Sequence, residues 1–502
     1  MRYLHTPAEA ARWLRAQVQG VLHTDSRRVQ WGDGFIAWPG GVTDGRRFVP
    51  ETLQQGAAAC LVEADGLDAF DWHAEPDTRV AAYHGLKQAS GPIAAAYYER
   101  PSSEVPVLAV TGTNGKTSTT WWLAHALHAL GQRCALVGTL GVGEPGDLHY
   151  TGMTTPDPVL LQACLRDWAD AGVQACAIEA SSIGIAEHRL DATQIRVAVF
   201  TNFTQDHLDY HGDMDAYWRA KAALFDWPGL QAAVVNIDDP KGLGLVQHLA
   251  ERPHLSVWTY STRKLPLWKA NHHLQAFNLR QGEQGVQFNL YEEGEIHALD
   301  TALLGHYNIG NLLAVLAVMR IQGHALGDAV RVCAGLPAVP GRMQSVHAGD
   351  DHVAPWVVVD YAHTPDAVAQ ALQALRPFAQ ERAGELVCVL GCGGDRDPAK
   401  RPLMAAAAEQ HADRVVLTSD NPRSEDPQTI VDQMCAGLSR APQIVLDRAE
   451  AIAASIAQAR DNDIVLIAGK GHEDHQEIAG VRHPFSDVAH ARRAMRAWRV
   501  HV

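Results

Sequence analysis

The feature of this 502-residue chain that most constrains its fold is an apolar run that leads directly into a glycine-rich turn ending in Lys-Thr. Residues 105–120 read VPVLAVTGTNGKTSTT, and apolar residues at helical spacing continue through Leu123 and Leu127. This order predicts a buried strand, a tight loop and a helix. Backbone N–H groups in such a loop, together with the helix N-terminus, bind phosphate oxygens. Lys116 is placed to reach terminal phosphates, and Thr117 to offer a hydroxyl to Mg2+.

This loop is a compressed variant of the common phosphate-binding loop. The common spacing has a further glycine where this chain has Val110. A glycine-rich turn that binds nothing is the alternative interpretation. The Lys-Thr pair at the start of the predicted helix favours phosphate binding.

Length and charge exclude several classes of protein. The chain is too long for one hydrophobic core, so three domains are expected. Its formal net charge of −15 argues against nucleic acid or an anionic membrane as a partner, because both need a basic face. The eight cysteines are scattered without a CxxC pair, which indicates reduced thiols.

The first residues, MRYLHTPAEAARWLRAQ, have the pattern of a short amphipathic helix without an apolar signal core. No apolar run approaches the length of a membrane span. We therefore expect a cytoplasmic enzyme, acting as a monomer on small molecules, with no nucleic-acid or membrane partner.

The order of the predicted elements indicates an α/β protein with three domains. Residues 1–92 are rich in turns and predict a small N-terminal α/β module. Residues 93–338 open with the phosphate loop and alternate strands such as 175–179 and 197–202 with helices such as 158–171, which predicts a mostly parallel sheet. A more β-like stretch, about 255–299, interrupts this alternation, and a helix over 308–319 follows. Residues 339–502 predict a Rossmann-like, doubly wound C-terminal domain.

Polar clusters follow the predicted strands of the last domain. Strands are expected at 356–361, 386–390, 414–418, 443–446 and 464–468. The clusters DYAHTPD, GCGGDRD, SDNPRSED and GKGHED each come just after a strand. Doubly wound sheets bind ligands beyond the carboxyl ends of their strands, so these clusters are candidate binding loops.

Two strand ends of the central domain carry candidate metal ligands. Glu179 ends the run ACAIE, and Asp206 and His207 follow the strand RVAVFTN in the text FTQDHLDYHG. A carboxylate, or a neutral imidazole, at this edge would serve a phosphate-bound metal ion. An exposed acid at a strand end is the alternative for Glu179. Lys221, in the helical text AYWRAKAALF, reads by itself as a solvated helix residue.

Two arginines of the C-terminal domain are candidates for binding an anion. Arg423, in DNPR, would form a bidentate pair with a carboxylate, and Arg396, in GGDRD, occupies a comparable loop. A turn with a solvated arginine is an equal alternative. GKGHED, with its flanking glycines, suits close approach of the backbone to a ligand but is a weak signal alone.

Taken in order, these motifs make the chain resemble the Mur ligases, ATP-dependent enzymes that form amide bonds in peptidoglycan synthesis. The match runs nearly end to end, through a DSRxVxxGDxF-like text, GTNGKTS, TTPDP, EASS, DHLDYHG, AYWRAK, GHYNIGN, GRM, DYAHTPDA, GCGGDRD, DNPR and GKGHE. The text DHLDYHG followed by AYWRAK is typical of the subfamily that adds the third stem-peptide residue. DNPR is the form found in members that add meso-diaminopimelate rather than lysine.

The resemblance implies an ATP-dependent ligation of meso-diaminopimelate to UDP-N-acetylmuramoyl-L-alanyl-D-glutamate, with Mg2+ and an acyl-phosphate intermediate. The implied catalytic residues are Lys116, Glu179, His207 and Lys221. The implied metal ligands are Thr117, Glu179, His207 and Lys221, the last as a carbamate. The residues implied to hold ATP are Gly112, Thr113, Asn114, Gly115, Lys116, Thr117, Ser118, Asn308, Asn311, Arg342 and Asp360.

The residues implied to contact the other two substrates, the UDP-muramoyl-dipeptide and diaminopimelate, come from all three predicted domains. Those implied to contact the UDP-muramoyl-dipeptide are Thr24, Ser26, Gly41, Val42, Thr43, Thr154, Thr155, Ser181, Glu187 and Arg189. Those implied to hold diaminopimelate are Arg396, Asp420, Asn421, Pro422, Arg423, Gly469 and Glu473.

The chain departs from its relatives at a few positions, and three other functions stay open. Ile183 stands where relatives often have histidine, Glu187 stands where glutamine is common, and the first domain, with Trp31 and Trp38, differs from the usual text. The alternatives are a ligase that adds L-lysine, a ligase like folylpolyglutamate synthase, and a nucleotide-binding relative without catalysis. The DNPR text argues against the first two, and an intact set of implied catalytic residues against the third.

Overall fold

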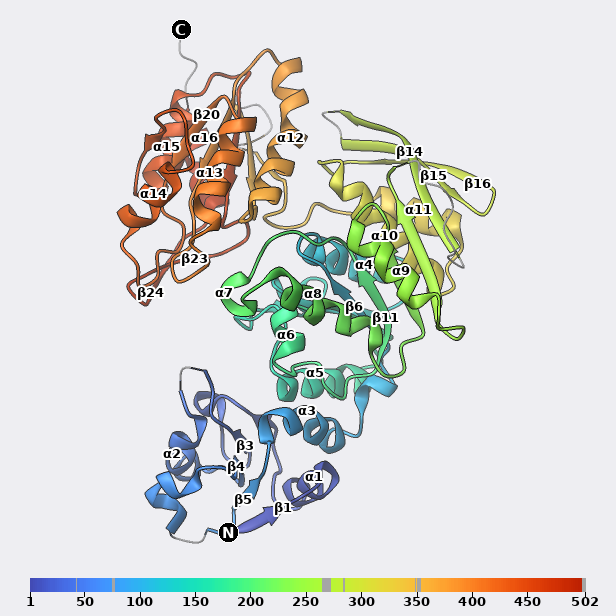
Figure 1. Ribbon diagram of the computed structural model, residues 1–502, viewed down its shortest axis with the longest axis vertical. Coiled ribbons are helices and arrows are strands. Elements are labelled where there is room, and N and C mark those ends of the chain that lie inside the picture. Colours follow the sequence, from blue (N-terminus) through green and yellow to red (C-terminus); the bar gives the residue numbers. More distant parts are fainter. Residues whose placement is uncertain are drawn as a thin grey trace.

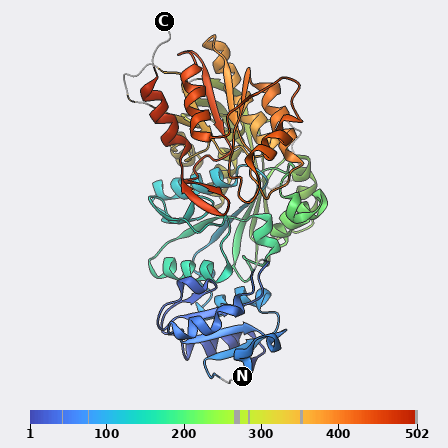
Figure 2. The same cartoon turned by 90° about the vertical axis from the view of Figure 1, so that its left-hand side faces the viewer.

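The computed structural model describes residues 1–502 except 42, 75–76, 264–271, 283–284, 348, 350–353 and 499–502. The chain forms three α/β domains that are stacked along the long axis of the molecule, with the central domain between the other two (Figures 1 and 2). Each domain has its own sheet, and the large sheets lie between helices. The prediction of a three-domain α/β fold is confirmed. In the described part of the chain, no helix is both long and apolar enough to cross a membrane.

The N-terminal domain is built on a five-stranded parallel sheet in the order β1-β5-β4-β3-β2. Its strands are β1 (Arg2–Leu4), β2 (Leu22–His23), β3 (Gly34–Ala37), β4 (Ala59–Glu63) and β5 (Val80–Tyr83), and its helices are α1 (Pro7–Arg15), α2 (Val49–Gln54) and α3 (Leu86–Tyr97). The sequence predicts a helix near the start of the chain, and the structure divides this segment into β1 and α1. Thr6 caps α1 by accepting a hydrogen bond from the Glu9 N–H, and Pro7 follows at the first helical position.

The central domain holds an eleven-stranded sheet in the order β16-β15-β14-β13-β12-β11-β6-β10-β7-β8-β9. Its strands are β6 (Val107–Thr111), β7 (Cys134–Gly138), β8 (Gly141–Glu144), β9 (Asp147–His149), β10 (Ala175–Glu179), β11 (Ile195–Phe200), β12 (Ala232–Asn236), β13 (Ser256–Ser261), β14 (His272–Gly282), β15 (Gly285–Glu292) and β16 (Glu295–Thr301). Strands from β7 to β14 in this order pair in parallel, whereas β8–β9 and β15–β16 extend the two edges in antiparallel pairing. The β-like stretch predicted near 255–299 is therefore one edge of the same sheet.

Helices cover both faces of the central sheet. They are α4 (Lys116–Ala129), α5 (Pro158–Asp170), α6 (Ser182–Ala186), α7 (Leu208–His211), α8 (Met214–Ala222), α9 (Pro240–Leu249), α10 (Tyr307–Ile321) and α11 (Leu326–Ala334). The apolar helix α10 is buried along most of its length and packs against α4 and the sheet. This packing fixes the start of α4, and with it the phosphate loop, against the carboxyl end of β6.

The C-terminal domain has a six-stranded sheet in the order β17-β18-β22-β19-β20-β21, parallel except for β17. Its elements are β17 (Gln344–Val346), β18 (Trp356–Asp360), α12 (Pro365–Glu381), β19 (Leu386–Leu390), α13 (Lys400–His411), β20 (Arg414–Leu417), α14 (Pro427–Cys435), β21 (Gln443–Ile444), α15 (Arg448–Gln458), β22 (Ile464–Ala468) and α16 (Asp487–Ala497). A separate hairpin, β23 (His475–Ile478) with β24 (Val481–Pro484), extends from this domain (Figure 1). The carboxyl ends of the parallel strands face the central domain.

Candidate active site

The phosphate loop joins the buried strand β6 to helix α4 and needs glycine at two positions. Gly112 has φ +148° and Gly115 has φ +86°, both in the region that favours glycine. A Cβ on Gly112 would lie 1.9 Å from Thr201 Oγ1, and one on Gly115 would lie 2.4 Å from Asn311 Oδ1. The loop therefore packs closely against the next strand end and against α10.

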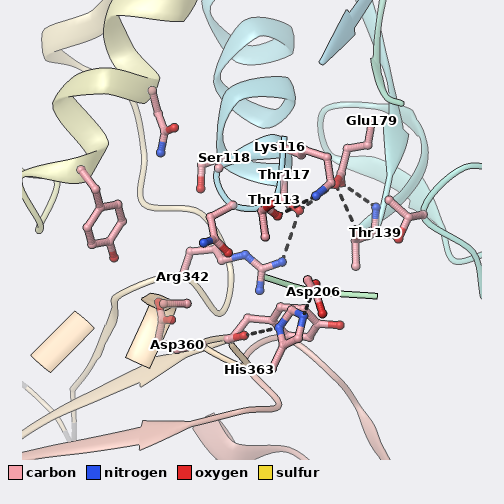
Figure 3. A pocket seen from close by; sticks show the side chains of 18 of the residues that line it. Thr113, Lys116, Thr117, Ser118, Thr139, Glu179, Asp206, Arg342, Asp360 and His363 are labelled. Atoms are coloured by element: carbon pink, nitrogen blue, oxygen red, sulfur yellow. Dashed lines mark hydrogen bonds and ion pairs between the residues drawn. The ribbon is translucent and has the colours of Figure 1, made fainter. Parts of the chain in front are cut away.

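A pocket opens over this loop and is lined by most of the residues predicted to hold ATP (Figure 3). Lys116 reaches back over the loop, where Nζ donates to the carbonyls of Gly112 and Thr113 at 2.8 Å each. The predicted residues that line the pocket are Thr113, Asn114, Gly115, Lys116, Thr117, Ser118, Asn311, Arg342 and Asp360. Gly112 and Asn308 lie just behind it, and Asn308 Oδ1 accepts a hydrogen bond from Asn311 Nδ2 at 3.0 Å.

Residues from beyond the central domain close the far side of this pocket. Arg342 Nη2 donates to the Thr117 hydroxyl at 3.2 Å, and its guanidinium lies 4.0 Å from the centre of the Tyr361 ring. Asp360 ends β18 and accepts a hydrogen bond from the Met343 N–H at 2.6 Å. Burial raises the pKa of Asp360, although Arg342 opposes this shift. Asn114 Nδ2 also donates to Asp366 at the start of α12.

Glu179 occupies the centre of an oxygen-rich corner of the pocket. This carboxylate is 1% exposed. Its Oε2 accepts from the Thr117 hydroxyl at 3.0 Å, and its Oε1 accepts from the Thr139 N–H at 2.8 Å. The alternative interpretation of Glu179 as an exposed strand-end acid is wrong, because β10 ends inside the pocket.

His207 lines the same pocket, and Lys221 contacts the phosphate loop. Burial lowers the pKa of His207 to about 3, so its imidazole is neutral at neutral pH. Lys221 is 1% exposed, and its Nζ donates to the Gly112 carbonyl at 2.7 Å. Burial, and then the nearby charge of Lys116, hold the pKa of Lys221 well below its ordinary value. Lys221 is therefore not a solvated helix residue, as the sequence alone would suggest.

A second pocket, lined by loops of the C-terminal domain and by the central domain, adjoins the first. Six of the seven residues predicted to hold the amino acid line it, namely Arg396, Asp420, Asn421, Arg423, Gly469 and Glu473. Pro422 is buried and does not line the pocket; its carbonyl oxygen would lie 1.9 Å from a Cβ on Gly394. The DNPR turn thus packs directly against the GGDRD loop.

The left-handed backbone of Arg423, at φ +53°, is held by the hairpin β23–β24. The Arg423 N–H donates to the Glu477 carbonyl at 3.0 Å, and Arg423 Nη1 donates to the Gly394 carbonyl at 2.5 Å. Lys470 is buried beneath the turn and binds both Asn421 Oδ1, at 2.9 Å, and Glu473 Oε2, at 2.7 Å. Short polar contacts therefore fix the side chains of Arg423, Asn421 and Glu473 in the second pocket.

The two pockets are continuous, because six residues line both of them. These shared residues are Thr139, Thr154, Asp206, His207, Tyr361 and His363. We call this shared region the junction. A group activated in the first pocket can be reached there by a nucleophile held in the second.

A third pocket lies in the N-terminal domain and contains three of the residues predicted to contact the UDP-sugar. Thr24, Ser26 and Thr43 line it, together with Trp38 and Phe48. Gly41 does not line this pocket, and Val42 lies outside the described residues.

The residues predicted to contact the muramoyl-dipeptide take several positions. Thr154 and Ser181 line the first pocket, whereas Thr155 is buried and donates to the Glu179 carbonyl at 2.7 Å. Arg189 Nη1 donates to the Thr155 carbonyl at 3.0 Å. Glu187 pairs with Lys87 of α3 at 2.6 Å. Glu187, which stands where relatives commonly have glutamine, therefore forms an ion pair between the N-terminal and central domains.

Comparison with known proteins identifies the family to which this three-domain chain belongs. Residues 110–319 match the Mur ligase middle domain, and residues 341–471 match the Mur ligase glutamate ligase domain. The chain belongs to the Mur ligase family. It is 54% identical to the UDP-N-acetylmuramoyl-L-alanyl-D-glutamate–2,6-diaminopimelate ligase of Acidovorax sp. (strain JS42), covering 99% of both chains. It is 46% identical to the protein of the same name from Janthinobacterium sp. (strain Marseille), covering 96% of both.

A solved structure of a UDP-N-acetylmuramoyl-L-alanyl-D-glutamate–2,6-diaminopimelate ligase matches this Mur ligase with a TM-score of 0.62 and 37% sequence identity. The alignment covers 95% of this chain and 94% of that one. The resemblance predicted from the order of the motifs is thus confirmed.

The donor set of this Mur ligase fits a divalent cation beside the phosphate loop. The buried Glu179 carboxylate and the Thr117 hydroxyl supply oxygen atoms, which Mg2+ prefers. A neutral His207 leaves one ring nitrogen able to act as a ligand. An unmodified Lys221 offers no oxygen donor to a cation, whereas its carbamate would add two.

Sequence reasoning missed part of the junction and a lysine of the second pocket. It selected Asp360 from DYAHTPD but not Tyr361 or His363, and it made no prediction for Thr139 or Lys400. For His363 a signal existed, because it follows a strand end in a cluster already identified as a binding loop. Lys400 carries no such signal, because it lies in an ordinary helical text, AKRPLMAAAA.

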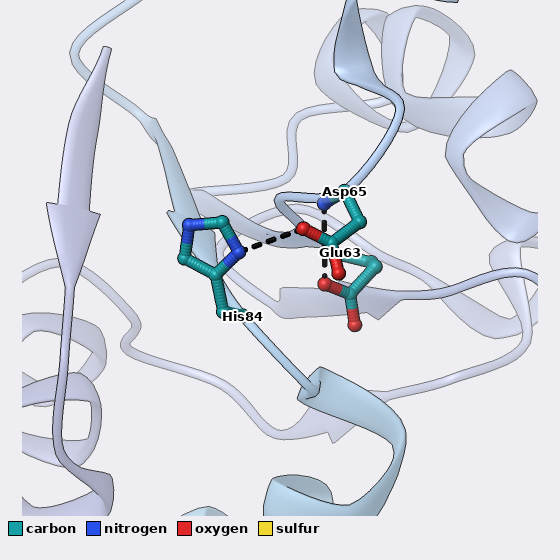
Figure 4. Close-up of side chains that lie close together, drawn as sticks. All are labelled: Glu63, Asp65 and His84. Atoms are coloured by element: carbon teal, nitrogen blue, oxygen red, sulfur yellow. Dashed lines mark hydrogen bonds and ion pairs between the residues drawn. The ribbon is translucent and has the colours of Figure 1, made fainter.

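One acidic cluster lies away from these pockets, in the N-terminal domain. Glu63, Asp65 and His84 are close enough together to resemble a metal site (Figure 4). Glu63, however, accepts hydrogen bonds from the N–H groups of Gly85 and Leu86 at 3.1 and 2.7 Å, where α3 begins. His84 and Asp65 form an exposed pair at 2.8 Å. Helix capping therefore accounts for the buried carboxylate.

Proposed function

We propose that this Mur ligase joins meso-2,6-diaminopimelate to UDP-N-acetylmuramoyl-L-alanyl-D-glutamate at the expense of ATP, in the cytoplasmic part of peptidoglycan synthesis. The observation that carries the proposal is the junction, which connects a phosphate-loop pocket to a pocket containing Arg423 of the DNPR turn. The names of the two relatives described above agree with it.

The three domains divide the substrates among them. The N-terminal domain, residues 1–92, takes the UDP moiety, the central domain, 93–338, takes ATP, and the C-terminal domain, 339–502, takes the amino acid. The first of these boundaries falls within helix α3. The ligase acts as a monomer and needs no nucleic acid or membrane.

The reaction begins with transfer of the γ-phosphoryl group. A γ-carboxylate oxygen of D-glutamate attacks the γ-phosphorus of ATP, and the bond to the bridging oxygen of ADP breaks. Such transfer depends on positioning and on neutralising charge. Lys116 and the N–H groups of the loop bind the phosphates, and Arg342 closes over the nucleotide from the C-terminal side. Asn308 and Asn311 border the base.

The product of this step is an acyl phosphate at the junction. The uncharged amine of diaminopimelate attacks its carbonyl carbon, an amide bond forms, and inorganic phosphate leaves with the electron pair of the C–O bond. The ammonium form loses one proton to its surroundings before the attack, and the attacking nitrogen loses a second one as the amide forms. Arg423 and Arg396 hold carboxylates of the amino acid, and Asp420, Asn421 and Glu473 hold its far ammonium group.

Thr117, Glu179, His207 and the carbamate of Lys221 would hold Mg2+. When bound, the ion would neutralise the charge that gathers on the phosphates. The chain itself contributes by fixing these donors: Thr139 orients Glu179 through its N–H, and Lys221 is held against the loop at Gly112.

Phosphate release provides the test. With ATP present, release should require both UDP-muramoyl-dipeptide and an amino acid, and meso-diaminopimelate should be the preferred one in a panel with L-lysine and L-glutamate. Preference for lysine would support the lysine-adding alternative, and use of a folate with glutamate would support the folylpolyglutamate alternative. Binding of ATP without turnover under any combination would indicate a non-catalytic relative.

A further inference from the structure

A buried lysine faces the junction from the C-terminal domain and has no role in the mechanism above. Lys400 is the first residue of α13, after the GGDRD loop, and it is 9% exposed. It lines the second pocket beside Cys392 and Met404, both of which are buried. Burying a cation among apolar side chains costs free energy unless the charge is paired or hydrogen-bonded.

The contacts of Lys400 leave its donors available. In the described part of the chain, the ionic partner of Lys400 is Asp206, with Nζ 3.8 Å from Oδ1, which is beyond hydrogen-bond distance. Asp206 itself accepts from the His207 N–H at 2.9 Å and lies 3.3 Å from His207 Nε2. An ammonium carries three donors, so Lys400 can bind another oxygen while it stays beside Asp206.

Neighbouring cations are committed to direct partners. Lys470 binds Asn421 and Glu473, and Arg401, which follows Lys400 in the chain, binds Glu425 through both oxygens at 2.7 and 2.8 Å. Lys116 lies on the nucleotide side of the junction, where the phosphates of ATP would balance its charge. Among the residues that the structure describes, Lys400 is therefore the buried cation that remains on the amino-acid side of the junction.

Attack of the amine converts the carbonyl of the acyl phosphate into a tetrahedral intermediate with a negatively charged oxygen. Catalysis gains most from donors that are aimed in advance at such a charge. We propose that Lys400 donates to this oxygen and so accelerates amide formation, rather than phosphoryl transfer. This inference rests on the ligation proposed above.

Measuring acyl-phosphate formation separately from the complete ligation distinguishes this role of Lys400 from a role in phosphoryl transfer or in substrate binding. Lys400→Met keeps the length and apolar contacts of the stem and removes the charge, and Lys400→Arg keeps a cation. The first half-reaction is measured as hydroxamate formed when hydroxylamine traps the acyl phosphate, with ATP and UDP-muramoyl-dipeptide but no amino acid. The complete reaction is measured with saturating meso-diaminopimelate. Circular dichroism checks that both variants fold.

Lys400→Met should lower kcat for ligation by about 100-fold or more, the usual effect of losing one oxyanion donor. Hydroxamate formation and the KM for diaminopimelate should stay within about threefold, and Lys400→Arg should recover part of the lost kcat. Lys241→Met, which removes a lysine from a different surface pocket, is the matched control and should leave both halves unchanged.

Other outcomes overturn the proposal in distinguishable ways. An equal loss in both halves would mean that the Lys400–Asp206 pair serves domain closure instead. A raised KM for diaminopimelate with kcat retained would assign Lys400 to a carboxylate of the amino acid. Unchanged kinetics would refute any role. If the unsubstituted enzyme itself forms neither hydroxamate nor product, the proposed function fails and not the role of Lys400.

Discussion

Arg342 Nη2 donates a hydrogen bond to the Thr117 hydroxyl at 3.2 Å, so an arginine that follows the central domain reaches the first turn of the helix that starts at the phosphate loop. The same guanidinium covers the Tyr361 ring of the C-terminal domain at 4.0 Å. One side chain thus contacts both the helix that starts at the phosphate loop and Tyr361 of the C-terminal domain. We therefore expect nucleotide binding and the position of the C-terminal domain to be coupled through this contact.

Arg342→Ala should raise the KM for ATP by about tenfold or more, because it removes a charge-assisted donor, which is typically worth roughly 1.5–3 kcal/mol. Lys cannot reproduce both the stacking and the forked donors, so Arg342→Lys should recover only part of the loss. Steady-state kinetics with ATP varied measure this. If Arg342→Ala leaves the KM for ATP unchanged, Arg342 contributes only to packing against Tyr361.

Lys116→Ala should abolish turnover, with kcat lowered by at least about 100-fold, because the loop loses its phosphate-binding cation. The fold should persist, since among the described residues the Lys116 side chain donates only to two carbonyls of its own loop. Phosphate release and circular dichroism give the two readouts. Lys241→Ala is the control for loss of a lysine elsewhere in the domain, and near-normal turnover of Lys116→Ala would disprove the assignment of the loop.

Lys221 should act as a carbamate. The lowering of its pKa by burial favours the uncharged amine, which is the form that reacts with CO2, and its burial would shield the product. Lys221→Ala should be nearly inactive, and a short carboxylic acid should restore part of the activity by filling the space. Mass spectrometry under native conditions and activity at low CO2 are the measurements. Full activity of an unmodified lysine in CO2-depleted buffer would contradict this role.

The buried ion pair Arg448–Asp487 should dominate the local stability of the C-terminal domain. Arg448 Nε and Nη2 donate to the two Asp487 oxygens at 2.8 and 2.7 Å, and both side chains are fully buried. Removing one partner leaves an uncompensated charge, so Arg448→Met should cost about 3–5 kcal/mol. The double variant Arg448→Met, Asp487→Leu should recover much of this loss. Urea unfolding of the full chain, followed by fluorescence, would refute the prediction if the single variant lost under about 1 kcal/mol.

The sequence predicted the elements that carry continuous apolar runs. Strands β10, β19 and β22 have the bounds expected from the sequence, because in each an uninterrupted run of mostly aliphatic residues extends between the flanking loops. Strand β1 was not predicted, since three residues carry no period and gain their structure by pairing with β5. The edge strands β8 and β9, of four and three residues, are similarly short, and they owe their structure to the pairing of β8 with β7 and of β9 with β8.

The residues of the candidate site likewise include some that the sequence could predict and some that it could not. Loops that follow strands, such as DNPR and GKGHE, could be assigned to a binding edge because parallel strands bring their carboxyl ends together. Lys221 and Lys400 lie in helical text, and only the packing of α8 and α13 turns them toward the loop and the junction. Which domain faces which is likewise decided by contacts such as Asn114 with Asp366, far apart in the sequence.

Arg423 should decide the choice of amino acid. Its guanidinium lines the second pocket, where the left-handed backbone and the Gly394 carbonyl fix its direction. A carboxylate at the far end of diaminopimelate can pair with it, whereas L-lysine would present an ammonium group that it repels. Arg423→Ala should therefore raise the KM for meso-diaminopimelate by about tenfold or more, at roughly 1.4 kcal/mol per decade, and leave the KM values for ATP and UDP-muramoyl-dipeptide nearly unchanged. Arg440→Ala, which removes an exposed arginine of the same domain outside this pocket, serves as the control. Normal diaminopimelate kinetics in Arg423→Ala, or a preference of the unsubstituted enzyme for lysine, would mean that another group recognises the amino acid.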